Sequence, residues 1–186
     1  MTDLEKAKEL FRDEGLAFPA IPNDLAVKIK EQGRWLYSSR EITISPYNLD
    51  EYVHEVDEAQ VDDYIVLSHS GHGANSYAIQ YYVLNGPLRL FLHLGWGGAY
   101  MDAEASAALI RDCFLIADQI VSASQRAAPV LAGERLTVVV SDTYGSYWLP
   151  PGVSQMSEDS VQNDPLEVLN EVLAWLTTSR SLADRL

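Results

Sequence analysis

A short segment near the middle of the chain carries side chains that could perform acid–base or nucleophilic chemistry. Residues 63–76 read Asp-Tyr-Ile-Val-Leu-Ser-His-Ser-Gly-His-Gly-Ala-Asn-Ser, so His69 and His72 stand where an apolar run gives way to glycines. Side chains at such a turn can reach a ligand. An ordinary hairpin needs the same residues, because glycine and asparagine supply the positive φ values of tight turns. The segment therefore predicts either a functional histidine or a structural turn.

The run Ser70-Gly71-His72-Gly73 resembles the catalytic-histidine segment of metacaspases and caspase-like cysteine peptidases, in which a Ser-Gly-His-Gly motif likewise ends a strand. Those enzymes place a nucleophilic cysteine some tens of residues later, often after an aspartate, and Asp112-Cys113 lies downstream here. The resemblance implies His72 as the general base and Cys113 as the thiolate nucleophile. The pattern around Cys113 predicts another role, since it falls on the apolar side of a helical period, where cysteine packs as a small hydrophobe.

The two histidines could also be metal ligands together with Asp62, Asp63 or His93. Residues three apart on a strand face opposite sides, so His69 and His72 converge only if the turn begins at His69. We expect instead two turn histidines that hydrogen-bond to the backbone, and neither a metal site nor a cofactor.

A second group of candidate residues is aromatic and lies in two glycine-containing segments, 95–100 and 142–152. Tyrosine and tryptophan in loops are favoured interface anchors, because they bury a large rigid area at little cost in entropy. The alternative is that they cover the sheet edge as ordinary loop packing. The candidate binding residues are Trp96, Tyr100, Tyr144, Tyr147 and Trp148.

The charge of the chain favours one class of partner. With 27 acidic and 13 basic residues the formal net charge is −14, which repels phosphate backbones and anionic lipid headgroups. We therefore expect no nucleic-acid and no membrane partner, whereas a basic protein would be attracted; the charge could equally serve solubility alone. The single cysteine excludes an intrachain disulfide, and no secretory signal or apolar run of roughly 20 residues is present, so we expect a cytoplasmic protein.

Hydrophobic periodicity predicts the elements that position these residues. Four helices are expected, over residues 3–14, from a cap at Asn23 to near Gly33, over 103 to about 125, and over 165–178. Residues 64–68, 77–84 and 88–94 predict three strands joined by short turns, 136–140 a further strand, and 35–37 with 42–44 an edge hairpin. Residues 46–62 are expected to be irregular.

Together these elements predict an α+β fold over residues 1–186 as a single domain, with a mostly antiparallel meander sheet of about five strands covered on one face by two or more helices. Residues 141–163 are expected to form a loop whose composition is compatible with mobility. The function that fits best is a non-enzymatic interaction domain, immunity-like or inhibitor-like, that binds a basic partner protein. The alternative is a hydrolase using His72 and Cys113. The oligomeric state stays open.

Overall fold

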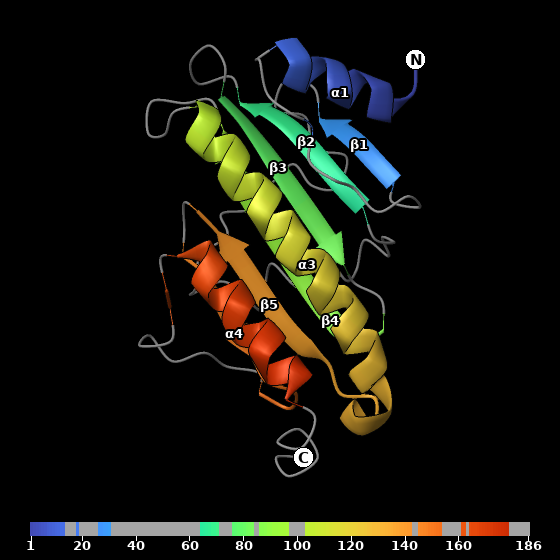
Figure 1. Ribbon diagram of the computed structural model, residues 1–186. Coiled ribbons are helices and arrows are strands. Elements are labelled where there is room, and N and C mark those ends of the chain that lie inside the picture. Colours follow the sequence, from blue (N-terminus) through green and yellow to red (C-terminus); the bar gives the residue numbers. More distant parts are fainter. Residues whose placement is uncertain are drawn as a thin grey trace.

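The fold is taken from a computed structural model that describes residues 1–13, 18, 26–30, 64–70, 76–83, 86–96, 103–142, 145–153, 161, 162 and 164–178. In chain order the elements are α1 (Asp3–Asp13), β1 (Ala26–Lys30), β2 (Tyr64–Ser70), β3 (Ser76–Val83), β4 (Leu88–Trp96), α3 (Ala103–Leu131), β5 (Leu136–Ser141), β6 (Tyr147–Leu149) and α4 (Pro165–Thr177). The strands form one sheet in the order β1-β2-β3-β4-β5-β6 (Figure 1). The expected α+β class is confirmed.

The sheet is mixed, so the prediction of a five-stranded, mostly antiparallel meander is wrong in detail. Only its centre is a meander, with β2, β3 and β4 pairing antiparallel as their short connections predict. On either side of it β1 pairs parallel with β2, and β5 pairs parallel with β4. Helix α3 forms the crossover between β4 and β5, because parallel neighbours need a long connection.

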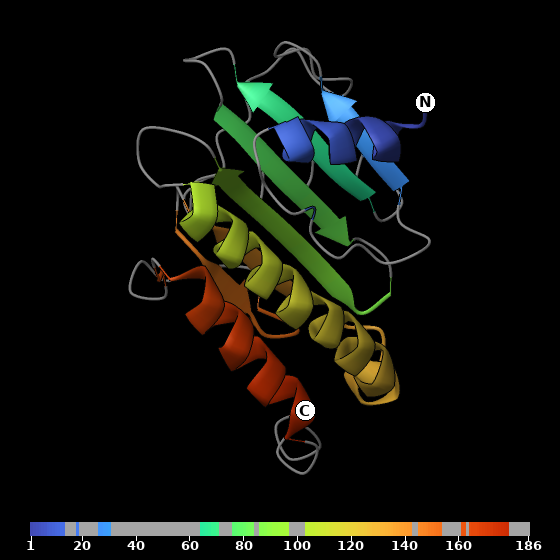
Figure 2. The same ribbon diagram turned by 45° about the horizontal axis from the view of Figure 1, so that its top comes forward.

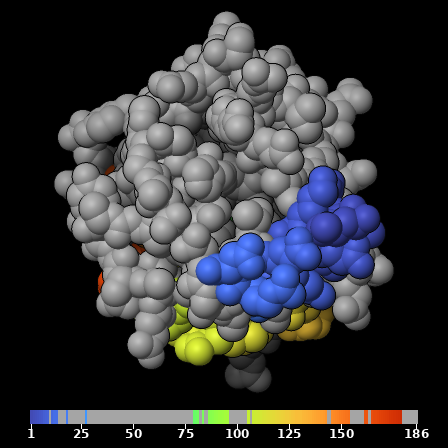
Figure 3. Space-filling view, turned by 90° about the horizontal axis from the view of Figure 1, so that it is seen from above, coloured from blue at the N-terminus to red at the C-terminus, as the bar shows by residue number. Residues whose placement is uncertain are grey.

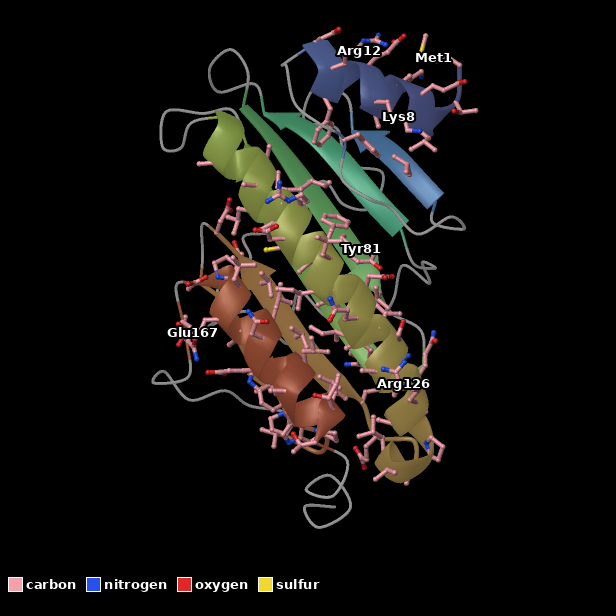
Figure 4. All side chains as sticks on the ribbon, in the orientation of Figure 1. Met1, Lys8, Arg12, Tyr81, Arg126 and Glu167 are labelled. Atoms are coloured by element: carbon pink, nitrogen blue, oxygen red, sulfur yellow. The ribbon has the colours of Figure 1, made fainter. Side chains whose placement is uncertain are left out.

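All three described helices cover one face of this sheet. Helices α3 and α4 lie side by side over β4 and β5, and α1 lies near β1 and β2 (Figures 1 and 2). Figure 3 looks onto the end of the molecule where α1 and the first turns of α3 reach the surface. Alternate residues of the central strands point to the helices, and Tyr81 of β3 stacks on Phe114 of α3 with ring centroids 5.1 Å apart (Figure 4). The helix side of the core includes Phe11, Ile79, Leu90, Leu92, Ile110, Cys113, Val138, Val140, Leu169 and Val172.

The opposite face of the central strands is buried as well. In the pairing of β4 with β5, Phe91 stands beside Val139 and His93 beside Ser141, one residue out of phase with the leucines that meet the helices. Phe91, Val139 and Tyr147 are each only 1% exposed. Strands of the parallel pair are therefore enclosed on both sides, which explains the near-continuous apolar run of β5.

Local signals position the helix ends. Thr2 and Glu5 form a capping box at α1, in which the Thr2 backbone N–H donates to Glu5 Oε2 at 2.6 Å and the Glu5 N–H donates to Thr2 Oγ1 at 3.2 Å. At α4 the Leu166 N–H donates to Asp164 Oδ1 at 3.0 Å, with Pro165 in the first turn. Helix α3 runs about one and a half turns beyond the predicted end, because buried Ala127 and Leu131 continue its apolar side.

The helix expected between Asn23 and Gly33 is a strand instead. Ala26–Lys30 pairs in parallel register with residues 64–68 of β2. The segment reads Ala-Val-Lys-Ile-Lys, so apolar and charged residues alternate with the period of a strand, and its β-branched residues favour one. The capping signal at Asn23 is local, and pairing with β2 outweighs it. The hairpin predicted at 35–44 and the irregular segment 46–62 lie outside the described residues.

A strand also interrupts the segment expected to be a loop over 141–163. Residues 147–149 form β6, which pairs antiparallel with β5, and Ser146 pairs with Gln162 in both directions at 2.6 and 2.7 Å between N and O. Gly145 makes this return possible: its φ is +98°, and an added Cβ would lie 2.6 Å from Val161 Cγ1. Of the helices in the described ranges, none is long and apolar enough to cross a membrane.

Candidate functional site

Cys113 lies in the core, as its position in the helical period predicts. It is 0% exposed on the sheet-facing side of α3, in the cluster shared by α3, α4 and the helix side of the sheet. Burial raises the pKa of the Cys113 thiol to about 12, and the carboxylates of Asp142, Asp112 and Asp164 act in the same direction. The thiol therefore stays protonated near neutral pH, whereas a nucleophilic cysteine needs an accessible thiolate.

The histidine part of the peptidase resemblance lies mostly outside the described residues. His72 is not among them, and of His69 only the backbone is described. Strand β2 continues through His69 to Ser70, so the chain does not turn at His69. The condition for His69 and His72 to converge, a turn that begins at His69, is not met. Within the described ranges no three His, Cys, Asp or Glu side chains are grouped to hold a metal ion.

A polar row, in which Gln80 and Ser141 are buried and His93 is partly buried, crosses three adjacent strands near the carboxyl end of the parallel pair. Gln80 of β3 pairs in register with His93 of β4, and His93 pairs with Ser141 of β5. His93 Nδ1 lies 3.4 Å from Ser141 Oγ, while the Asp142 carboxylate accepts a hydrogen bond from the Gly95 N–H at 2.9 Å.

Burial lowers the pKa of His93, and the nearby Asp142 carboxylate offsets part of that shift. The imidazole is therefore held neutral at physiological pH, and Ser141 is only 1% exposed. A histidine beside a serine and an aspartate is a constellation used for acyl transfer, but that chemistry needs a hydroxyl that a substrate can reach. The row instead satisfies polar groups inside the sheet, as buried polar groups require.

Of the aromatic candidates, Trp96, Tyr147 and Trp148 lie in described strands. Strands β2, β4 and β5 run in the same direction, so their carboxyl ends share one edge of the sheet (Figure 1). Trp96 is the last residue of β4, whereas Tyr100 and Tyr144 lie outside the described residues. Ligands of open α/β sheets commonly bind at such an edge, so the position of Trp96 keeps this residue as a binding candidate.

Tyr147 and Trp148 lie in β6 and point to opposite faces of the sheet. Tyr147 stands beside Val139 on the face away from the helices and is 1% exposed, so its ring offers no surface anchor. Trp148 stands beside Val138 on the helix side and is half-buried against α4. Its indole Nε1 donates to Glu171 Oε2 at 3.3 Å, and its ring centroid lies 5.5 Å from that of Trp175 at a tilt of 55°.

These contacts make a surface that we call the α4 patch, consisting of Trp148, Gln162, Glu167, Glu171 and Trp175. Glu171 is its centre, because Gln162 Nε2 also donates to it, with a distance of 2.9 Å to Oε1. Glu167, Glu171 and Trp175 are spaced four residues apart along one line of the helix. Glu167 points outward on the side of α4 away from α3 (Figure 4).

Sequence reasoning had selected Trp148 but missed its neighbours. The four-residue spacing of Glu167, Glu171 and Trp175 was visible in the sequence and could have indicated a shared helix face. Nothing in the sequence indicated that Trp148 sits on a strand next to that face.

No known protein family, curated protein or solved structure matches this chain.

Proposed function

We propose that this protein is a non-enzymatic interaction domain that binds a basic partner protein, in the manner of immunity or inhibitor proteins. The observation that carries the proposal is that the carboxylates of α4, Glu167 and Glu171, have no ion-pair partner among the described residues. The ion pairs of the described residues join Lys6 to Asp3, Arg12 to Glu9 and Arg111 to Asp112, and none involves a carboxylate of α4. Such carboxylates remain free to attract a cationic surface.

The size of the charge adds a long-range component. A formal net charge of −14 raises the rate at which a basic protein meets this one and lowers it for nucleic acids and anionic lipids. A cytoplasmic setting belongs to the same proposal, since a lone cysteine suits a reducing compartment. The hydrolase alternative would need an accessible thiolate at Cys113, and the burial of that residue weighs against it.

The experiment is affinity capture from the source organism followed by binding kinetics at several salt concentrations. We expect a captured partner with a basic surface and an on-rate that falls as salt rises, because exposed charges are screened within about 10 Å at 0.1 M salt. A Tyr100→Ala/Trp148→Ala double variant should weaken affinity by about 2 kcal/mol or more if these aromatics anchor the complex. An acidic partner, or an on-rate indifferent to salt, would refute the proposal.

A further inference from the structure

Two neutral donors orient the Glu171 carboxylate, and among the residues that the structure describes no cation pairs with it. The indole N–H of Trp148 and the amide of Gln162 each hold one of its oxygens. Both donors fix its direction without neutralising its charge, and Glu171 remains exposed. Glu167, one turn away, is exposed too, and helix α4 contains no lysine or arginine. The outward side of α4 thus presents negative charge, and two hydrogen bonds fix the orientation of the Glu171 carboxylate.

The two tryptophans beside this carboxylate supply the second requirement for binding a cation. Trp148 and Trp175 are each only partly buried, and their ring centroids lie 5.5 Å apart. An indole face attracts a cation placed within about 6 Å of its centroid, more strongly than the face of tyrosine or phenylalanine. Because the rings pack on the core and Trp148 is tied to Glu171, little entropy is lost when they receive a ligand.

We propose that the α4 patch is the docking surface for a basic segment of the partner protein, with an arginine side chain at its centre. This inference rests on the function proposed above and assigns it a place on the molecule. Arginine fits better than lysine, because its planar guanidinium can stack on an indole while its N–H groups pair with a carboxylate. Charge complementarity selects a protein segment as the occupant, since a chain of net charge −14 repels phosphate-bearing surfaces.

The test uses the full-length protein labelled with ¹⁵N and an acetylated, amidated tetra-arginine peptide as the probe. The chain has four tryptophans, and the indole N–H resonances of Trp148 and Trp175 can be assigned with the variants Trp148→Phe and Trp175→Phe. Titration at low ionic strength should move the Trp148 and Trp175 resonances in a saturable way. A Gly-Ser tetrapeptide should leave them unmoved.

Two matched charge variants locate the effect. Glu171→Gln keeps an acceptor for the Trp148 indole and removes one charge, and we expect it to weaken binding about threefold or more. Asp118→Asn removes the same charge from an exposed position on α3 outside the patch and should leave the affinity unchanged. Unperturbed spectra of both free variants would show that they are folded.

The possible failures separate the two proposals. Saturable binding that moves other resonances, or that is equally strong in Glu171→Gln, would overturn the α4 patch while leaving a basic partner in place. Absence of any binding by tetra-arginine, together with capture of an acidic partner, would overturn the proposed function and the docking surface with it.

Discussion

Helices α1 and α4 both bury an apolar side against the same core, yet they differ in whether their surface carboxylates pair with cations. Helix α1 carries four carboxylates and three cationic side chains within eleven residues. Two of its carboxylates pair with cations three residues away, Asp3 with Lys6 at 3.9 Å and Glu9 with Arg12 at 3.7 Å. Helix α4 has two carboxylates, Glu167 and Glu171, and no cation.

The difference shows that a net charge of −14 says little about where a partner would bind. Along α1 three cations stand among the four carboxylates and two ion pairs form, so the field of this helix is partly cancelled and it interacts more weakly with an approaching cationic surface. Along α4 the field is not cancelled, and it coincides with the exposed parts of two tryptophans. Of these two helices, local pairing of charges thus distinguishes α1 from α4.

The comparison assumes that both helices are firmly packed, and the largest expected effect tests this assumption. Leu169→Ala in α4 and Phe11→Ala in α1 should each cost about 3 kcal/mol of unfolding free energy, because both side chains are almost fully buried. Urea unfolding followed by circular dichroism would measure the loss. Asn170→Ala, at an exposed position of α4, is the control and should stay within about 0.5 kcal/mol. If Phe11→Ala proved equally mild, α1 would be loosely attached and the comparison unsound.

The interior beneath α3 and α4 can be tested through its one thiol. Cys113→Ala should cost about 1 kcal/mol without loss of binding, because the side chain only fills space. In the unmodified protein a thiol reagent at neutral pH should react no faster than the protein unfolds, since burial and the raised pKa keep the thiol protected and protonated. Complete reaction in denaturant is the control. Rapid labelling of the native protein would contradict the packing and revive the peptidase alternative.

The two helix starts should respond alike, since both are capped by side chains. Asp164→Ala should destabilise the protein by about 1 kcal/mol, because the Leu166 N–H loses its acceptor, and Thr2→Ala should cost a similar amount or less. Asp164→Asn retains an acceptor and should cost only a few tenths of a kcal/mol. Thermal or urea unfolding of the three variants provides the measurement. If Asp164→Asn lost as much stability as Asp164→Ala, Asp164 would act through its charge instead.

How far the sequence predicts this fold depends on the range of the interactions involved. The positions of α1, α3 and α4 and the antiparallel pairing of β2, β3 and β4 depend on residues close together in the chain, and the sequence predicts them. Strand β1 was misread because its conformation depends on pairing with β2, more than thirty residues later. Strand β6 was missed because three residues rich in aromatics look like a loop until their pairing with β5 is known.

The residues of the candidate site also differ in whether local sequence patterns predict their positions. Cys113 could be placed in the core from its helical period alone. The row of Gln80, His93 and Ser141 can be recognised only when the register of three strands is known. The contact of Trp148 with Glu171 joins a strand to a helix, and no local sequence pattern indicates that these two elements are neighbours. The residue type of Trp148 was enough to select it as a binding candidate, whereas its contact with α4 had to come from the structure.

The smallest expected effect concerns the pH dependence of α1. The Thr2 backbone N–H and hydroxyl donate to Glu5 Oε2, and the backbone bond contributes most to lowering the pKa of this carboxyl below its usual value of 4.5. A carboxyl whose pKa is lower in the folded state stabilises that state above its unfolded pKa, and the contribution is lost as the pH falls through the folded value. Glu5→Gln should therefore flatten the decline of stability below about pH 4.5 without changing its direction. Glu9→Gln, on the same helix but outside the capping box, is the matched control. Unfolding free energies measured between neutral and acidic pH would check the prediction. An identical decline in the two variants would show that the hydrogen bond between the Thr2 N–H and the ionised Glu5 carboxylate does not stabilise the protein in solution.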